Sequence, residues 1–377
     1  MSGVYVTEEG SPWGEGRPVT TQSMMKAFLQ CPREVYYKYH LRLQPKSLSK
    51  PLTRGKWIHA LLEVYYKALK TGSNDDAMAE MWEEHRRWSG RFLKLFDEEK
   101  DHLGDLPREI KEIMDGYFWH YGDPRFRDHS EWFVHDAELT LEAELPNGHI
   151  FRGRFDLLVE NDFGLWLVDH KSHKKLPDWS HRMFDIQAPL YTWAARESGI
   201  PVTGFMWNYL GTSARSTPQL IKDGSRFSKT GWASTDYPSA LAAVKAAGWI
   251  DGKRVHVPGN EDHTLELRAR LKALRDQRWA PGQVPTSPFY RRDELVHTDE
   301  QIQRVVDTAA RTSERMHSYD YSAEPIERNT VECKGWKCSY QSLSLADLVN
   351  GESDRIKKQE YMVGDPLAYY EDETGKE

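Results

Sequence analysis

The chain contains few cysteines and no long apolar segment. Three cysteines in 377 residues are too few for the disulfide framework of small secreted proteins. No apolar run approaches the roughly 20 residues that a membrane-spanning helix needs, and residues 1–16 are acidic and glycine-rich, without the apolar core of a secretory signal. We therefore expect a soluble, cytoplasmic protein that makes no membrane contact.

Excess positive charge is also absent, since the formal net charge is −7. This charge excludes non-specific coating of nucleic acid by the whole molecule, so any such contact must be a local groove. The basic residues gather in three clusters, which are Lys38, Arg42, Lys46, Lys50, Arg54 and Lys56, then Lys171, Lys174, Lys175, His181 and Arg182, then Arg291 and Arg292. Charge clusters are usually solvated faces, but two of these flank the candidate site described below.

The apolar share of 39% permits a substantial core, in two or three domain-sized units or one elaborated domain. Apolar spacing predicts a short helix from Ser23, its N-cap, to a break near Cys31-Pro32, and further helices over 56–70 and within 75–120. Alternating residues predict strands over 138–145, 149–159 and 165–170, with a hairpin turn at Asn147-Gly148. A helix over 183–198 then leads to a strand over 202–210, which we expect to complete the sheet by a crossover.

These elements divide the chain into six segments. We predict a flexible segment over 1–20, a helical part over 21–130, a core sheet over 131–211, an accessory, partly helical region over 212–330, a cysteine segment over 331–350 and a mobile charged tail over 351–377.

Two short motifs carry most of the chemical information. Gly153-x-x-Asp156 and Asp169-x-Lys171 lie in neighbouring strand-like runs, so two carboxylates and an ammonium can converge where the strands end. Carboxylates are ligands for Mg²⁺ or Mn²⁺, which would orient water, and Lys171 can stabilise charge on a phosphate. An isolated Asp-x-Lys is common, however, and also fits two surface acids and a lysine.

Two helical motifs strengthen the interpretation. His59 follows Gly55 by about one helical turn, and Gln187 and Tyr191 are spaced i, i+4, so each pair shares a helix face. A lone histidine is more often structural than a ligand, but the joint order of the four motifs is unusual.

In this order of motifs, the chain resembles the RecB-type branch of the PD-(D/E)XK nuclease superfamily, which includes CRISPR-adaptation and phage exonucleases. The resemblance covers roughly residues 23–210 and resumes near the C-terminal cysteines. It implies an α/β, restriction-endonuclease-like fold, a mixed central sheet flanked by helices, and a DNA substrate in recombination, repair or replication. It also implies that the metal ligands are His59, Asp156, Asp169 and the backbone carbonyl of His170, with Lys171 catalytic and with Gln187 and Tyr191 completing the site.

Many relatives also hold an iron–sulfur cluster on four cysteines. Cys31, Cys333 and Cys338 stand near three of those places, but the fourth, six residues beyond Cys338, is Ser344. Serine replaces thiolate poorly, so either a degraded cluster or three buried or idle thiols fits the sequence.

We therefore expect a metal-dependent DNA exonuclease whose Arg54, Lys174, Lys175 and Arg182 follow the DNA backbone, at DNA ends or single strands. A recombinase, helicase or single-strand-binding protein is a conceivable partner. Two alternatives stay open. One is a catalytically silent nucleic-acid-binding partner of a helicase or recombinase with the same fold, and the other is a non-nucleolytic metal hydrolase on an unrelated fold.

Overall fold

The computed structural model describes residues 17–121, 132–222, 224, 226–228, 230–232, 234–251, 254–255, 260–276, 287–322, 326–329, 338–349 and 351–367. The helices are α1 Gln22–Gln30, α2 Pro32–Val35, the π-helical turn η1 Tyr36–His40, α3 Lys50–Thr71, α4 Asn74–Leu93, α5 Asp97–Leu103, α6 Leu106–Tyr121, α7 Trp179–Met183, α8 Gln187–Glu197, the 3₁₀ turn η2 Thr230–Trp232, α9 Tyr237–Ala246, α10 Glu261–Asp276, α11 Asp299–Ser318, α12 Gln341–Leu348 and α13 Ser353–Glu360. The strands are β1 Val19–Thr20, β2 Leu43–Pro45, β3 Phe133–Glu144, β4 Ile150–Asn161, β5 Gly164–His173, β6 Gly204–Gly211, β7 Ile250–Asp251, β8 Arg254–Val255, β9 Tyr290–Leu295 and β10 Tyr361–Val363.

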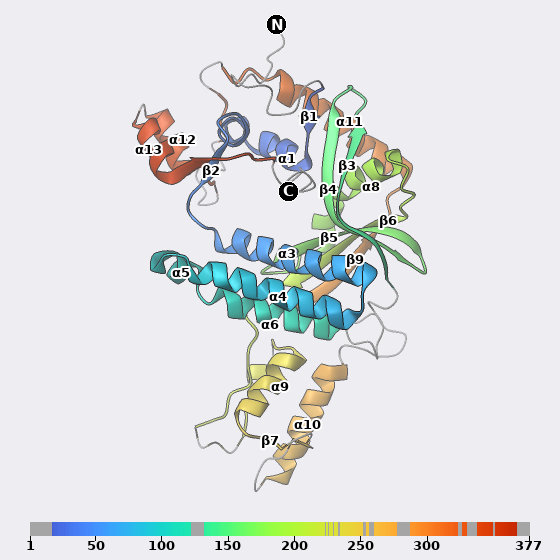
Figure 1. Cartoon of the computed structure of the whole chain (residues 1–377), viewed down its shortest axis with the longest axis vertical. Helices are drawn as coiled ribbons and strands as arrows, with labels where there is room; N and C mark the ends of the chain where they lie inside the picture. Colours follow the sequence, from blue (N-terminus) through green and yellow to red (C-terminus); the bar gives the residue numbers. More distant parts are fainter. Residues whose placement is uncertain are drawn as a thin grey trace.

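A mixed sheet organises the molecule (Figure 1). Strands β3, β4 and β5 form the predicted antiparallel meander, and the turn between β3 and β4 contains Gly148 at a φ of 81°. Helix α8 then returns the chain so that β6 pairs with β5 in parallel, which confirms the crossover. Strand β9 pairs antiparallel with β6, and the short β1 runs parallel beside the start of β4. The predicted α/β class with a mixed, helix-flanked sheet is confirmed.

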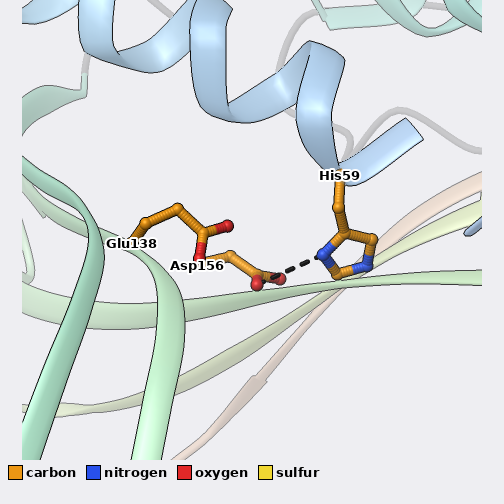
Figure 2. A group of neighbouring side chains, drawn as sticks. All are labelled: His59, Glu138 and Asp156. Carbon is orange, nitrogen blue, oxygen red and sulfur yellow. Dashed lines mark hydrogen bonds and ion pairs between the residues drawn. The ribbon is translucent and has the colours of Figure 1, made fainter. Parts of the chain in front are cut away.

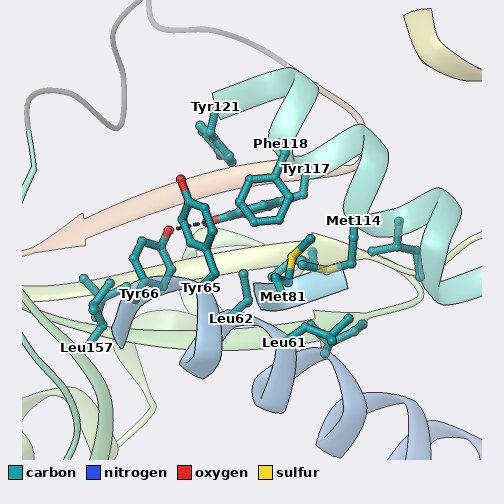
Figure 3. Packing of buried hydrophobic residues seen from close by; sticks show 14 of the residues in the cluster. Leu61, Leu62, Tyr65, Tyr66, Met81, Met114, Tyr117, Phe118, Tyr121 and Leu157 are labelled. Atoms are coloured by element: carbon teal, nitrogen blue, oxygen red, sulfur yellow. Dashed lines mark hydrogen bonds between the residues drawn. The ribbon is translucent and has the colours of Figure 1, made fainter. Parts of the chain in front are cut away.

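Helices cover both faces of this sheet. Helices α3, α4 and α6 share one apolar cluster with β5 and β6, and part of that cluster is drawn in Figure 3. Tyr65 and Tyr66 of α3 pack there against Tyr117 and Phe118 of α6, and the Tyr66 and Tyr117 hydroxyls lie 2.9 Å apart. Helices α8 and α11 cover the opposite face in a second cluster. Apolar residues recur along one side of α3, so burying that side places the helix across the sheet.

The N-terminal helix begins two residues earlier than expected. Thr21 is its N-cap and accepts a hydrogen bond from the Met24 backbone N–H at 3.2 Å, so the prediction of Ser23 as N-cap was wrong. Ser23 lies within α1, and Met24, Met25, Ala27 and Phe28 form its buried side. The break at Cys31-Pro32 is confirmed, because Cys31 is extended and Pro32 begins α2.

Two segments take a larger part in the fold than the sequence suggested. Strand β9 and helix α11 fall within 212–330 and join the main sheet and its covering layer, whereas α9 and α10 lie beyond α6, away from the sheet (Figure 1). Residues 353–363, for which we expected mobility, form α13 and β10, because β10 pairs with β2 and Tyr361 is buried against Tyr340. No helix in the described ranges has the length and apolar character needed to cross a bilayer.

Candidate metal and nuclease site

The two aspartates of the sequence motifs meet at the junction of β4 and β5. Asp156 directly precedes Leu157, which pairs with Val168, and Asp169 directly follows Val168. Both carboxylates are almost fully buried. The backbone N–H of His170 donates a hydrogen bond to Asp156 Oδ2 at 2.6 Å, so the start of the Asp-His-Lys motif binds the carboxylate of the neighbouring strand directly.

Helix α3 brings His59 to the same place (Figure 2). Its neighbours Trp57 and Ile58 are fully buried in the core, which fixes the helix, whereas the His59 side chain stays 28% exposed at the edge. His59 Nδ1 lies 3.2 Å from Asp156 Oδ1. A residue 97 positions upstream therefore faces the motif aspartate, and its role as a metal ligand stays a prediction.

Lys171 and Gln187 hold the second carboxylate from two sides. Lys171 Nζ lies 2.6 Å from Asp169 Oδ2, and Gln187 Nε2 donates to Asp169 Oδ1 at 2.5 Å. Gln187 is the first residue of α8, so the crossover helix begins at the site. Both oxygens of Asp169 are thus oriented by cationic or amide groups before any ligand arrives.

Tyr191 packs one helical turn beyond Gln187. Its ring lies between Phe151 and Phe205, with centroids 6.1 Å from each. A Cβ placed on Gly153 would meet Tyr191 Cε1 at 2.8 Å, closer than side chains tolerate. The glycine of the Gly-x-x-Asp motif is therefore required by space, because α8 approaches the β4 backbone there.

His170 contributes its backbone to the site while its side chain lies in a buried polar network. Its Nδ1 is 2.8 Å from Asn208 Nδ2, which also donates to the Tyr117 hydroxyl at 2.9 Å. The ring stacks on Tyr66, and burial lowers the pKa of His170 to about 3, so the imidazole is neutral. That its backbone carbonyl binds metal stays a prediction.

Glu138 is a site residue that the motif analysis missed. Ligand atoms of His59, Glu138 and Asp156 all lie within 4.8 Å of one another. The β3–β4 register pairs Ala137 with Leu157 and Leu139 with Phe155, so Glu138 lies directly across from Asp156. Counting outward from the Asn147-Gly148 turn could have found it, provided that the three-residue loop had been recognised.

The backbone at Glu138 is strained, and the side chains of β3 and β4 exchange faces of the sheet at this point. Its φ is 60°, in the left-handed region that non-glycine residues rarely adopt. Leu157 and Val159 pack under α3, yet Phe155 packs under α8, although these three would share one face of a regular strand. The faces exchange at Glu138 and Asp156, which lets one cluster of acids meet groups from both helical layers.

Burial and mutual charge shift the titration of this cluster. Burial raises the pKa of Glu138 to about 7, and the neighbouring Asp156 charge adds to the shift. Burial also raises the pKa of Asp169 to about 6, although Lys171 opposes it. For Asp156, burial raises the pKa but is outweighed by His59, His170 and Lys171, so the net pKa lies well below the ordinary value. A bound divalent cation would offset both the burial and the mutual repulsion of these carboxylates.

Comparison with known families shows the superfamily of the chain. The model of the PD-(D/E)XK nuclease superfamily matches residues 20–343. The chain belongs to the PD-(D/E)XK nuclease superfamily. That Asp156 and Asp169-x-Lys171 form the motif for which the superfamily is named stays a prediction. A crystal structure of a Eubacterium rectale protein named "putative exonuclease" aligns over 89% of this chain and 94% of its own, with 12% identity and a TM-score of 0.40. No curated protein matches.

The cations predicted to follow DNA in this PD-(D/E)XK protein differ in their surroundings. Arg54 forms an ion pair with Glu109, which also binds Lys50 at 2.8 Å. Arg182 lies 2.6 Å from Asp293. Lys174 and Lys175 are exposed beyond the end of the Asp-x-Lys motif. DNA contact by all four stays a prediction, and the two lysines have the charge that is more accessible to a phosphate.

The residues present do not fit an iron–sulfur cluster held by four cysteines. The chain has three cysteines, of which Cys333 lies outside the described residues. Cys31 Sγ accepts a weak hydrogen bond from the Asn329 backbone at 3.5 Å. Ser344, at the expected fourth position, is buried and accepts a hydrogen bond from Arg328 Nε at 3.3 Å. A hydroxyl engaged by a guanidinium is a poor ligand for iron, so we derive no chemistry from a cluster.

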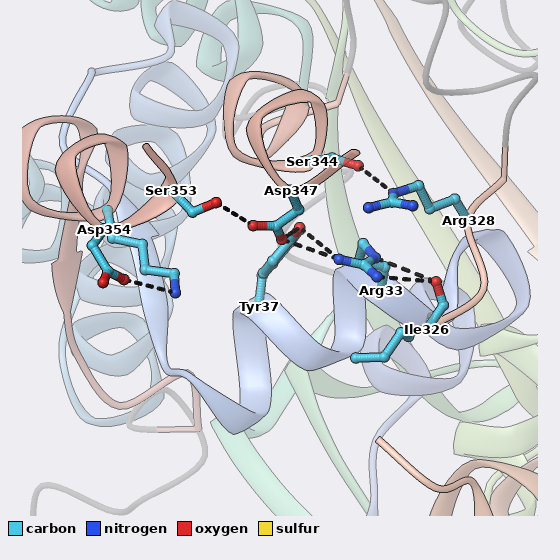
Figure 4. A network of polar contacts seen from close by, with 9 residues as sticks. Arg33, Tyr37, Ile326, Arg328, Ser344, Asp347, Ser353 and Asp354 are labelled. Atoms are coloured by element: carbon cyan, nitrogen blue, oxygen red, sulfur yellow. Dashed lines mark hydrogen bonds and ion pairs between the residues drawn. The ribbon is translucent and has the colours of Figure 1, made fainter. Parts of the chain in front are cut away.

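A polar latch joins α2 and η1 to the C-terminal helices α12 and α13 (Figure 4). We use this name for Arg33, Tyr37, Asp347 and Ser353. Arg33 Nη1 lies 3.0 Å from Asp347 Oδ2, to which the Tyr37 hydroxyl also donates, and Ser353 Oγ donates to Asp347 Oδ1 at 2.5 Å. Arg33 is only 2% exposed. The ion pair therefore connects α2 to α12 in a largely desolvated setting, where its loss is costly.

Proposed function

We propose that this protein is a divalent-metal-dependent DNA exonuclease of the RecB-type branch of its superfamily, acting in phage or bacterial DNA recombination, repair or replication. The observation that carries the proposal is the convergence of His59, Glu138, Asp156, Asp169 and Lys171, from three strands and one helix, around one buried acidic cluster. A silent relative has no need to keep both carboxylates, the lysine and the amide of Gln187 in mutual contact.

The donor set fits Mg²⁺ or Mn²⁺. Carboxylate oxygens of Glu138, Asp156 and Asp169 are the hard ligands that these ions prefer, and one imidazole is compatible with Mn²⁺. When bound, the ion would neutralise phosphate charge and make a water molecule more acidic. Burial lowers the pKa of His59, but the charge and the hydrogen bond of Asp156 outweigh burial and raise it to about 9. The imidazole is therefore protonated at neutral pH and must lose a proton to serve as a metal ligand.

Lys171 acts as a fixed cation in this proposal. Burial lowers its pKa, but the charges of Asp169 and Asp156 outweigh burial, and the net pKa is raised. Without a metal on these carboxylates the amine is therefore favoured as an ammonium, and its role in the proposal is to stabilise negative charge on the phosphate or to steer the attacking water. Gln187 holds Asp169 in place, and the Trp207 ring, 5.3 Å from Lys171 Nζ, limits where the ammonium can lie.

Cleavage of end-labelled DNA tests the proposal. Single and double strands labelled at the 5′ or the 3′ end, incubated with Mn²⁺ or Mg²⁺, should yield mononucleotides or short products from one end, and chelation should stop the reaction. Asp156→Asn and Lys171→Met should each lower the rate by at least about a hundredfold, since each removes charge stabilisation in a buried site. Asp162→Asn, in the exposed turn of the same β4–β5 hairpin, is the matched control.

The outcome also separates the alternatives. DNA retention without any cleavage at saturating metal would support the silent binding partner. Hydrolysis of small phosphoesters but not of DNA would support a different metal hydrolase. Full cleavage by Lys171→Met would contradict the assigned role of the motif lysine.

A further inference from the structure

A cavity of about 430 Å³ adjoins the proposed catalytic residues. Lys171 and Gln187, which hold Asp169, form one end of its lining, with Trp207 and Tyr209 of β6 beside them. The opposite wall comes from the N-terminal helices and presents Gln22, Lys26, Gln30, Glu34 and Lys38. The cavity thus borders the candidate site at Lys171 and Gln187, the two residues that contact Asp169.

The N-terminal wall has the chemistry of a phosphodiester-binding surface. Helix α1 buries Met24, Met25, Ala27 and Phe28 in the protein and turns its amide and ammonium groups toward the cavity. Amides and ammonium groups donate hydrogen bonds to phosphate oxygens without reading base identity. This side of α1 is therefore suited to a nucleic-acid backbone of any sequence.

Lys38 is placed to gain from an anion. Its side chain is half-buried above the Tyr39 ring, with Nζ 5.1 Å from the ring centroid. Burial lowers the pKa of Lys38, and Glu34 offsets this only in part. Burial removes water that would stabilise the Lys38 ammonium, and a phosphate in the cavity would stabilise the ammonium in its place. Lys26, by contrast, is exposed at the rim, where it can meet a strand as it approaches.

The cavity favours one strand. It has a volume of about 430 Å³ and is lined by residues of α1, β5 and β6. A duplex presents two backbones and is wider than the α-helix, about 10–12 Å across, that one of its grooves admits. An unpaired strand needs less room and can bring its backbone to Lys38 and Lys171 together.

We propose that the cavity is the path of a single DNA strand, and that Lys26 and Lys38 bind backbone phosphates next to the scissile one. This inference rests on the proposed function, because it assumes that the strand ends at Asp156 and Asp169. It adds the substrate class, which is unpaired DNA, and two phosphate-binding residues on a wall outside the nuclease motifs.

Salt-dependent binding tests the two lysines. Fluorescence anisotropy of labelled oligothymidylate, free or annealed to oligoadenylate, is measured in EDTA across a salt series. Each phosphate contact on a single strand contributes about −0.7 to the slope of log K against log salt. Lys26→Gln should therefore reduce the slope by about 0.7, and Lys26→Gln/Lys38→Gln by about 1.4, with at least about a tenfold loss of single-strand affinity at low salt.

Matched variants control for net charge and folding. Lys94→Gln/Lys245→Gln removes two exposed lysines that do not line the cavity, and it should leave the slope and the single-strand affinity as in the wild type. Lys26→Arg should restore binding. Because Lys26 is exposed, its single variant tests the wall even if the Lys38 substitution lowers the thermal midpoint.

The results distinguish this inference from the proposed function. Wild-type affinity and slope in the Lys26 and Lys38 variants, with DNA cleavage intact, would overturn the strand path and leave the nuclease assignment standing. Single-strand binding that depends on both lysines, in a protein that hydrolyses no DNA with Mn²⁺ or Mg²⁺, would support the path and refute the nuclease. Equal losses in the Lys94/Lys245 control would also overturn the path.

Discussion

Gly153→Ala should damage both stability and the site, because the structure leaves no space for a methyl group. The added Cβ would lie 2.8 Å from Tyr191 Cε1 and 3.2 Å from Phe151 Cε1. Carbon atoms pack best at about 3.5–4.0 Å, so the ring must retreat by about 0.7 Å or more. Tyr191 is confined by Phe151 and Phe205, and it shares α8 with Gln187, so the movement would also disturb the bond to Asp169.

The expected cost of this overpacking is about 1–3 kcal/mol. Urea denaturation should show a lower midpoint with an unchanged slope, and DNA cleavage should fall with it. Gly90→Ala is the control, because Gly90 lies in the last turn of α4 with no neighbouring atom outside the helix backbone within 4 Å of the added Cβ. Relieved of glycine's entropy cost, that variant should gain about 0.5–1 kcal/mol.

A double-mutant cycle tests the cause directly. Tyr191→Ala removes the ring and should cost about 3–5 kcal/mol by leaving a cavity. In that background Gly153→Ala meets open space, so the pair should be coupled by about 1–3 kcal/mol in the favourable direction. If the two costs instead add within about 0.5 kcal/mol, the close approach of α8 to Gly153 is not what requires the glycine.

Further predictions concern the metal ligands and the latch. Glu138→Gln should weaken Mn²⁺ binding in calorimetric titration by at least about tenfold, as removal of a metal-site partner does, and unchanged affinity would exclude Glu138 from the site. Because ligands bind metal when deprotonated, wild-type Mn²⁺ affinity should fall as pH drops below about 9, where His59 takes up a proton, and fall further through about 7 and about 6, where Glu138 and Asp169 do so. Asp347→Ala should lower the free energy of unfolding in urea by about 1.5–3 kcal/mol, because it removes the carboxylate from buried Arg33, which keeps its bonds to the Ile326 carbonyl. Cys31→Ser/Cys338→Ser should neither change iron content nor abolish folding, and stoichiometric iron in the wild type would contradict the poor fit to a cluster.

Strong local patterns made the central sheet predictable. The hairpin of β3 and β4 combines alternating apolar residues with an Asn-Gly turn, and both signals act within a few residues. His59, Asp156, Asp169 and Lys171 could be proposed together because each lies in a recognisable motif. The distances between these residues could not be predicted, because they depend on how α3 packs across the sheet.

Elements without such patterns were missed for identifiable reasons. Strand β9 reads Tyr-Arg-Arg-Asp-Glu-Leu, so most of its residues are charged and it forms a strand only by pairing with β6. Helix α13 is highly charged and resembles a mobile tail, but the pairing of β10 with β2 holds it in place. Glu138 carries no motif of its own, because its role depends on cross-strand register and on a left-handed backbone angle.

The polar latch has a consequence for the order in which the molecule is completed. Arg33 and Asp347 are separated by 314 positions, and β2 must wait for β10, a comparable distance away. Translation proceeds from the N-terminus, and contacts between distant parts of a chain form late. The helices that carry Lys26 and Lys38 therefore gain their final support only after residues 338–363 have been synthesised. During synthesis the acids of the β3–β4 hairpin would therefore be in place before the helices of the proposed strand path are. DNA binding through that path should begin only when the chain is nearly complete.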